Sequence, residues 1–105
     1  MAERVSAAEF DSKVLASEIP VLVDFYSDSC IPCKRLSPVL SQLESEYAGR
    51  LGIVKVNVNF ESELVSKYEV LAAPTLVLFK DGSEAGRHRG TASKDELIEL
   101  INSLV

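Results

Sequence analysis

Cysteine is scarce in this sequence: its 105 residues include only two, Cys30 and Cys33, and tryptophan is absent altogether. Small secreted domains that rely on disulfide cross-links normally contain several pairs of cysteines. On the chain-entropy model, closing a loop this short contributes only about 2 kcal/mol, against ~3 kcal/mol for a loop of about 15 residues. A structural cross-link is therefore a weak explanation for the pair, and chemical reactivity is a better one.

Long hydrophobic runs are also missing. No apolar stretch approaches the roughly 18 residues of a membrane-spanning helix. The first residues, Met1 to Ser6, carry charges of both signs and lack the apolar core of a secretion signal. We therefore expect neither membrane insertion nor export, and we expect a cytoplasmic location.

Basic charge is in the minority, with 11 Lys and Arg side chains against 16 Asp and Glu, for a net charge of −5. No run of Lys or Arg is long enough to follow a phosphate backbone, so nucleic acid is not an expected partner. The length and the 47% hydrophobic content suit one core, so residues 1–105 are expected to form a single domain. We also expect a monomer.

Apolar periodicity and turn residues divide the chain into helices and strands. The pattern predicts, in order, a helix over about residues 7–17, a strand over 21–26, a long helix from residue 30, a strand over 51–58, a short helix over 61–68, a hairpin of strands 75–80 and 84–89, and a last helix from residue 93. Capping-box spacing at Ser6–Glu9 and Ser93–Glu96 marks two of the helix starts. The order predicts an α/β fold with a mixed sheet covered by helices on both faces.

Cys30-Ile31-Pro32-Cys33 lies between a predicted strand and a predicted helix. If Cys30 is the N-cap, Cys33 is the third helical residue and its amide can donate to the Cys30 sulfur. Pro32 fits the first turn, where an N–H would lack a helical partner. Lowering a thiol pKa of about 8.5 by roughly 1.5 needs ~2 kcal/mol, which a hydrogen bond to the charged sulfur and the helix dipole can supply.

The same geometry assigns roles to the two thiols. The N-cap sulfur of Cys30 faces solvent, whereas Cys33 is shielded by the strand behind it. Cys30 is therefore expected to attack a substrate disulfide, and Cys33 is expected to resolve the mixed disulfide that results. The second step needs a proton acceptor near a buried thiol.

Asp24 is the candidate for that acceptor. A carboxylate within the apolar strand over 21–26 is costly to bury unless it is paired, protonated or functional, and burial should raise its pKa. Lys55, between Val54 and Val56 on the other central strand, could pair with Asp24 and moderate that rise. The alternative is that Lys55 simply faces solvent on an alternating strand.

Several segments together resemble the thioredoxin family along nearly the whole chain. They are Val23-Asp24-Phe25, Cys30-x-Pro32-Cys33-Lys34, Pro38, Lys55, Ala73-Pro74-Thr75, Phe79-Lys80-Asp81-Gly82 and Gly90. The resemblance implies a thioredoxin fold, with a central mixed sheet of four to five strands flanked by four helices. It also implies a protein-disulfide reductase that binds no cofactor or metal and works through its redox-active disulfide.

The resemblance further implies a substrate-facing surface. Its residues here are Ile31, Pro32, Ala73, Pro74 and Gly90. Pro74 would be a cis proline beside the dithiol, which the sequence permits because cis peptide bonds are almost confined to the bond before proline. The backbone of Ala73 would pair with substrate chains. The family's roles for the two cysteines and the buried carboxylate agree with those argued above.

Two positions depart from the family pattern. Thioredoxins usually have tryptophan before the first cysteine and glycine after it, whereas this chain has Ser29 and Ile31. Ile31 places a branched apolar side chain beside the reactive sulfur and restricts the local backbone. Tyr26 stands where the family often has another tryptophan and can supply comparable aromatic packing.

Two other kinds of function compete with this one. A closed zinc site normally needs four ligands, and the chain has no second cysteine pair. His88 lies in a charged hairpin strand, where a surface histidine is the usual case, so it receives no role. An interaction module could use Ile31, Ala73 and Pro74 as an apolar docking surface without redox turnover, but the intact dithiol argues against that.

A nucleotide-binding motif is absent, so the chain is not expected to take electrons from a nicotinamide itself. The resemblance implies disulfide-containing client proteins and a reductase that recharges the dithiol. A flavin-containing, NADPH-dependent thioredoxin reductase is the donor that the family suggests, and nothing in these residues excludes a ferredoxin-linked donor.

Overall fold

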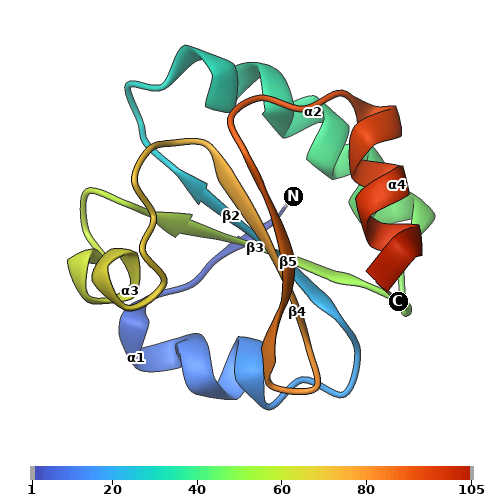
Figure 1. The fold of residues 1–105 in the computed structure, drawn as a ribbon, viewed down its shortest axis with the longest axis horizontal. Helices are drawn as coiled ribbons and strands as arrows, with labels where there is room; N and C mark the ends of the chain where they lie inside the picture. Colours follow the sequence, from blue (N-terminus) through green and yellow to red (C-terminus); the bar gives the residue numbers. More distant parts are fainter. Residues whose placement is uncertain (1, 105) are drawn as a thin grey trace.

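The computed structural model describes residues 2–104. One five-stranded sheet runs through its centre in the order β1-β3-β2-β4-β5 (Figure 1). The strands are β1 (Glu3–Arg4), β2 (Val21–Tyr26), β3 (Gly52–Asn57), β4 (Thr75–Lys80) and β5 (Ser83–Arg89). The helices are α1 (Ala7–Phe10), continued by the π-helical segment η1 (Asp11–Leu15), then α2 (Ile31–Glu46), α3 (Ser62–Lys67) and α4 (Lys94–Leu104).

The sheet is mixed, as the order of elements predicts. β3 pairs in parallel with β1 and β2, whereas β4 runs antiparallel to β2 and β5 antiparallel to β4. β2 lies in the middle, and all of its residues are buried. That burial explains why its sequence is apolar on both faces. The strands and helices agree with the fold that the family resemblance implies.

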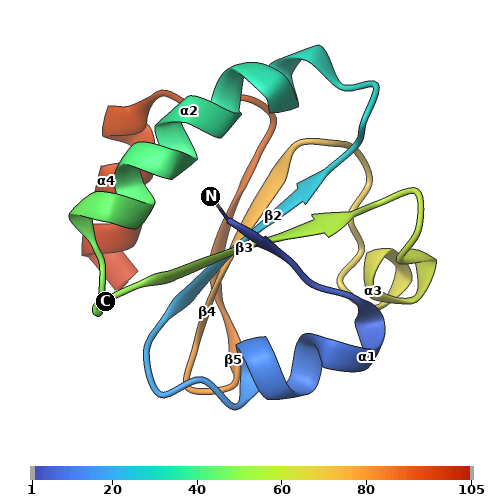
Figure 2. The ribbon, with the colours of Figure 1, turned by 180° about the vertical axis from the view of Figure 1, so that it is seen from behind.

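Helices cover both faces of the sheet (Figures 1 and 2). On one side α2 and α4 enclose a cluster that includes Leu22, Leu40, Leu43, Leu78, Leu97 and Ile101. On the other side α1, η1 and α3 enclose a cluster that includes Phe10, Val23, Phe25, Leu64 and Phe79. The sheet therefore separates two halves of the core, and β2 contributes side chains to both because alternate residues point to opposite faces.

Two elements differ from the prediction. β1 was not expected, because Glu3 and Arg4 are exposed polar residues with no apolar alternation, and they form a strand only by pairing with β3. The first helix ends near residue 15 rather than 17. The Ser17 hydroxyl donates to the carbonyl of Ile19 at 2.8 Å. A serine that bonds to nearby backbone in this way competes with continued helix.

Both predicted capping boxes are present at the helix starts. The Ser93 amide donates to Glu96 Oε1 at 3.0 Å, and the Glu96 amide donates to Ser93 Oγ at 3.1 Å. At the first helix, the Ser6 amide donates to Glu9 Oε1 at 3.1 Å. These local bonds satisfy amides that have no partner inside the helix.

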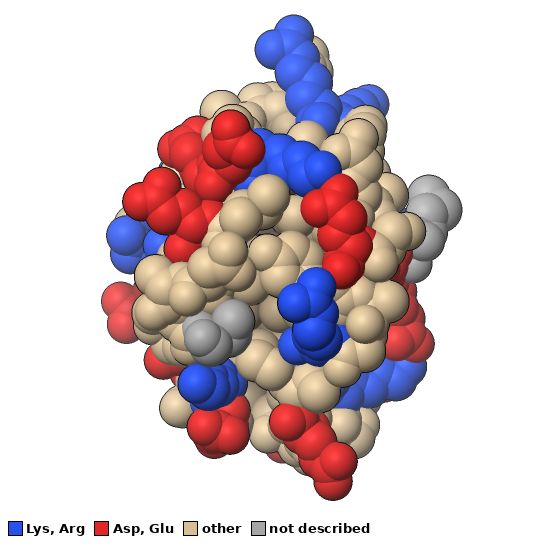
Figure 3. Space-filling model, turned by 90° about the vertical axis from the view of Figure 1, so that its right-hand side faces the viewer, with Lys and Arg blue, Asp and Glu red and all other residues tan. Residues whose placement is uncertain are grey.

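The helices within residues 2–104 include none long and apolar enough to cross a bilayer. On the face that carries α4, Lys and Arg side chains are interspersed with Asp and Glu (Figure 3). One such pair, Lys94 with Glu46, links α4 to α2. The outer surface of α2 and α4 thus carries charges of both signs.

Candidate active site

Three segments meet at one end of the sheet. The carboxyl end of β2 leads through residues 27–30 into α2, and the loop that enters β4 lies beside it (Figures 1 and 2). The carboxyl end of β3 points the same way because β3 is parallel to β2. The topology therefore brings the dithiol, Asp24 and Pro74 to one region, although they are far apart in the sequence.

Cys30 is the N-cap of α2, as its position between strand and helix predicts. Its sulfur accepts a hydrogen bond from the Cys33 amide at 3.1 Å. The two cysteines form a disulfide, with their Cα atoms 5.2 Å apart. Cys30 is half-buried, whereas Cys33 is only 6% exposed. The more accessible cysteine is thus the one at the helix N-terminus, where the dipole favours negative charge.

A hydrogen-bonded turn holds the residues that precede Cys30. The Cys30 amide donates to the Ser27 carbonyl at 3.2 Å. The Ser27 hydroxyl accepts from Asn59 Nδ2 at 3.2 Å, and it lies 3.3 Å from the Ser29 hydroxyl. Asn57 Nδ2 donates to Asp28 Oδ2 at 3.1 Å. These bonds tie the approach to Cys30 to the end of β3.

Asp24 is almost completely enclosed behind the dithiol. Its side chain is 2% exposed, and its Oδ1 has no hydrogen-bond partner among the described residues. Asp24 and Cys33 line one cavity of about 140 Å³, together with Lys55 and Ser37. Burial raises the pKa of Asp24 from its ordinary value of 3.8 to about 7, and the positive charge of Lys55 opposes that rise. A carboxyl group with this pKa can exchange a proton near neutral pH.

Lys55 lies opposite Asp24 in the parallel register of β2 and β3. It is half-buried, and its Nζ sits 4.5 Å from the centre of the Tyr26 ring. The described residues contain no hydrogen bond or ion pair between Lys55 and Asp24. The two side chains therefore interact by longer-range electrostatic attraction across the cavity. The side chain is neither a simple surface lysine nor a direct partner of the carboxylate.

The residues predicted to face substrate lie at the start of α2, in the loop before β4 and directly after β5. The Ala73–Pro74 peptide bond is cis, and Pro74 is buried. Gly90 has a φ of 85°, and its amide donates to the Pro74 carbonyl at 2.8 Å. That backbone conformation favours glycine. Ile31, by contrast, is 62% exposed at the first position of α2.

Two exposed apolar side chains at this end of the molecule were not predicted as part of the site. Phe60, in the loop after β3, is 70% exposed, and Leu71, in the loop before Pro74, is 88% exposed. The signal that could have found them is position: each lies in a loop at the end of the sheet where the dithiol sits. Neither side chain joins the two buried clusters of the core.

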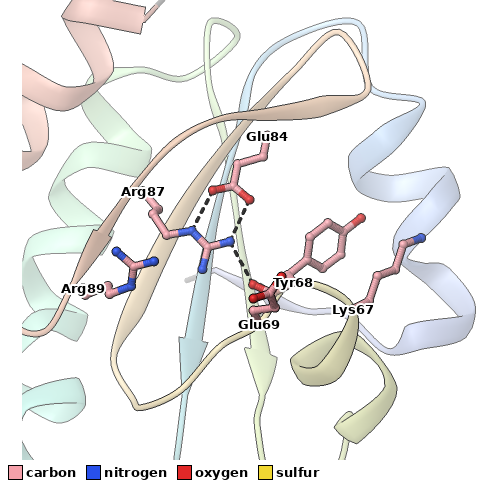
Figure 4. Close-up of a pocket in the computed structure, with 6 residues that line it drawn as sticks. All are labelled: Lys67, Tyr68, Glu69, Glu84, Arg87 and Arg89. Atoms are coloured by element: carbon pink, nitrogen blue, oxygen red, sulfur yellow. Dashed lines mark hydrogen bonds and ion pairs between the residues drawn. The ribbon is translucent and has the colours of Figure 1, made fainter.

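A second and more open cavity, of about 310 Å³, lies between the end of α3 and β5 (Figure 4). Arg87 in its wall donates to both carboxylate oxygens of Glu84, at 2.6 and 2.7 Å, and to the Tyr68 carbonyl at 2.9 Å. Its guanidinium is therefore held by protein groups. None of the residues predicted for the site lines this cavity.

Comparisons with known proteins agree with the fold and with the position of the two cysteines. A thioredoxin family model matches residues 1–103. The chain belongs to the thioredoxin family. It is 36% identical over 103 residues to a thioredoxin of Rickettsia bellii, and the match covers 98% of both chains.

Two further thioredoxins are similar over most of their length. Thioredoxin C-2 of Corynebacterium nephridii is 42% identical over 93 residues, which are 89% of this chain and 86% of the relative. A thioredoxin of Haemophilus influenzae is 39% identical over 98 residues, covering 93% and 92% respectively. The resemblance inferred from the motifs is thereby confirmed across the chain.

Membership of the thioredoxin family makes the protein a thiol–disulfide oxidoreductase. Its redox-active group is the Cys30–Cys33 disulfide. Within residues 2–104 no group of three or more His, Cys, Asp or Glu side chains is arranged to hold a metal ion. The family's partners are client proteins with disulfides and a thioredoxin reductase.

The departures from the family lie directly beside Cys30. Ser29 is exposed, and its amide and hydroxyl both face the Ser27 hydroxyl, at 3.4 and 3.3 Å. The position after Cys30 carries the exposed Ile31 side chain in place of the usual glycine. Exposed hydroxyl groups therefore precede Cys30 in the chain, and an exposed branched apolar side chain follows it.

Proposed function

We propose that the protein reduces disulfides in client proteins, with Cys30 as the attacking thiol and Cys33 as the resolving thiol. The Cys30 thiolate attacks one sulfur of the client disulfide, a mixed disulfide forms, and the other client sulfur leaves as a thiolate. The Cys33 thiolate then attacks the Cys30 sulfur and displaces the second client sulfur. The client gains two electrons and two protons, and the Cys30–Cys33 disulfide is formed.

The observation that carries this assignment is the position of Cys30 as the N-cap of α2. Its sulfur accepts the Cys33 amide hydrogen at 3.1 Å, and Cys30 is more exposed than Cys33. A hydrogen bond to the charged form and the helix dipole both stabilise the thiolate. The two effects together support an acidic Cys30 thiol that attacks first.

Asp24 is the proposed proton acceptor for Cys33. The two side chains line the same cavity of about 140 Å³. Burial raises the pKa of Asp24 to about 7, so the carboxyl group can take up the Cys33 proton and later release it near neutral pH. Lys55 is proposed to assist by balancing the negative charge that remains on the Asp24 carboxylate.

Client chains are proposed to lie over Ile31, Pro32, Ala73, Pro74 and Gly90. The bond between the Gly90 amide and the Pro74 carbonyl supports this, since it holds two of these residues together. An electron donor must then return the disulfide to the dithiol. We propose an NADPH-dependent flavin reductase or a ferredoxin-linked one, acting in the cytoplasm on a monomer whose residues 1–105 work as one thioredoxin domain.

Insulin reduction with dithiothreitol as donor tests the roles of the two thiols. Wild-type protein should accelerate the reduction, and Cys30→Ser should add nothing to dithiothreitol alone. Cys33→Ser should form a lasting mixed disulfide with insulin through Cys30, because no resolving thiol follows. Ser41→Ala, an exposed position of α2, is the folded control. Wild-type turnover no faster than that of Cys30→Ser would falsify the mechanism.

A further inference from the structure

Tyr26 lies at the carboxyl end of β2, two residues after Asp24, and is 6% exposed. Its side chain is on the same face of the sheet as Asp24, because residues two apart in a strand share a face. Both side chains line the cavity that also contains Cys33 and Lys55. Tyr26 is thus a neighbour of the proton-transfer groups, although it has no part in the mechanism above.

The Tyr26 ring contacts the cation that opposes Asp24. Lys55 Nζ lies 4.5 Å from the ring centre, within the range of a cation–π interaction. The guanidinium of Arg4 lies 5.8 Å from the same centre. The ring therefore holds the Lys55 ammonium through a cation–π contact. Without the ring, the flexible lysine side chain would be free to extend its ammonium toward water.

The Tyr26 hydroxyl takes no part in the cation–π contact with Lys55. It is buried, and it has no hydrogen-bond partner among residues 2–104. A buried hydroxyl without a partner lowers stability. The ring is therefore the part of this side chain that can act on Asp24, and removal of the hydroxyl alone should leave that action in place.

We propose that Tyr26 is a positioning residue for proton transfer at the dithiol: its ring fixes the Lys55 ammonium across the cavity from Asp24 and so sets the positive charge that the carboxylate feels. The proposal rests on the proposed role of Asp24 as proton acceptor. It assigns to the aromatic side chain at this position an electrostatic task in addition to packing.

Other groups also face Asp24. Lys34 and Cys33 of α2 and Asp28 of the loop before it line the same cavity, and Leu76 of β4 is its apolar neighbour in the sheet. Of these groups, Lys55 is the one whose charge lowers the pKa of Asp24 against the effect of burial. A change in where the Lys55 ammonium sits should therefore register directly in the titration of Asp24.

The test is a carboxyl-carbon NMR titration of Asp24 in the oxidised protein. Tyr26→Met keeps an apolar side chain of similar length but removes the ring, and it should raise the pKa of Asp24 by roughly 0.5. Tyr26→Phe should leave that pKa unchanged. Tyr26→Trp, whose ring binds cations more strongly, should lower it. Tyr47→Met is the matched control, since Tyr47 carries a cation–π contact with Arg50 instead.

A double-mutant cycle shows whether the ring acts through Lys55. In a Lys55→Met background, Tyr26→Met should leave the pKa of Asp24 unchanged. An equal rise in both backgrounds would mean that the ring acts by packing or exclusion of water, and it would overturn the proposal. The proposal would also be overturned if neither Tyr26→Met nor Tyr26→Trp shifted the pKa of Asp24. The Trp variant keeps the test informative if the Met variant fails to fold.

The titration needs no turnover, so its outcome is separate from that of the proposed mechanism. If Asp24 is not the proton acceptor, Asp24→Asn will resolve the mixed disulfide as fast as wild type, while the effect of Tyr26 on the titration persists. If the mechanism holds and Tyr26 acts as proposed, the pH midpoint of the resolving step should follow the pKa of Asp24 in each variant.

Discussion

Burial of Asp24 makes the stability of the fold depend on pH. Its pKa is raised from 3.8 to about 7 by burial, with Lys55 acting in the opposite direction. The folded protein therefore holds a proton on Asp24 at pH values where the unfolded chain has already lost it. This difference is a free-energy penalty on the fold above the pKa of the unfolded chain.

The sign of the pH dependence follows from this difference. Below about pH 4 both states are protonated, and Asp24 carries no penalty. As the pH rises from 4 to 7 the unfolded state gains stability by ionising, so the free energy of unfolding should fall by up to about 4 kcal/mol and then level off. Asp24→Asn removes this titration, so the variant should gain stability relative to wild type over that window.

Urea unfolding at several pH values measures this effect. The difference in unfolding free energy between Asp24→Asn and wild type should grow between pH values of roughly 4 and 7. Asp11→Asn, which changes an exposed carboxylate of η1, should show no such growth. A difference that stays constant across this range would contradict the buried titration of Asp24.

At the scale of single elements, the same N-cap geometry stabilises one helix and places a cysteine sulfur at the start of another. In α4 the N-terminal amides are satisfied by Ser93 and Glu96, which bond to each other's backbone. In α2 the corresponding position holds Cys30, whose sulfur accepts the Cys33 amide hydrogen. Sulfur is a weaker acceptor than a hydroxyl oxygen, so α2 exchanges a stronger cap for a reactive group.

The α4 cap gives a prediction about stability alone. Ser93→Ala removes the acceptor of the Glu96 amide and should lower the free energy of unfolding by about 1 kcal/mol. Redox activity should stay unchanged because α4 lies outside the dithiol region. Chemical denaturation of this variant beside Ser41→Ala, an exposed serine in the interior of α2, gives the comparison. Equal stability of the two variants would show that the cap contributes nothing.

At the scale of the whole molecule, one sheet divides the core into two clusters. Leu64 belongs to the cluster under α1 and α3, and Ile101 to the cluster under α2 and α4. β2 and β4 supply side chains to both clusters, so neither half can lose its packing without exposing the sheet that supports the other. A domain of this size built around one shared sheet is expected to unfold in a single transition.

Two core substitutions test that shared unfolding. Leu64→Ala should lower the free energy of unfolding by roughly 2–5 kcal/mol, and Ile101→Val by roughly 0.5–1.5 kcal/mol. The double variant should show the sum to within about 0.5 kcal/mol, because the sheet separates the two sites. Far-UV circular dichroism and tyrosine fluorescence should give the same urea midpoint. Two separate transitions would contradict the single cooperative unit.

Much of this architecture could be predicted because the signals are local. The apolar pattern of residues 21–26, the capping boxes and the hairpin turn each act over a few residues, and the structure contains the corresponding elements within one or two positions. β1 escaped prediction because its pairing with β3, and not its own sequence, makes it a strand. The π-helical end of the first helix was likewise not visible in the apolar spacing.

For the site, the sequence by itself determined that Cys30 caps a helix, since Cys-x-x-Cys between a strand and a helix places the first sulfur at the N-cap, and the structure has it there. It also identified Asp24 as an anomalous carboxylate. Only the tertiary structure decided how far Asp24 is enclosed, that Lys55 sits over the Tyr26 ring, and that Gly90 bonds to Pro74. These features depend on strand pairings and loops that join distant parts of the chain, so spacing within one segment cannot specify them.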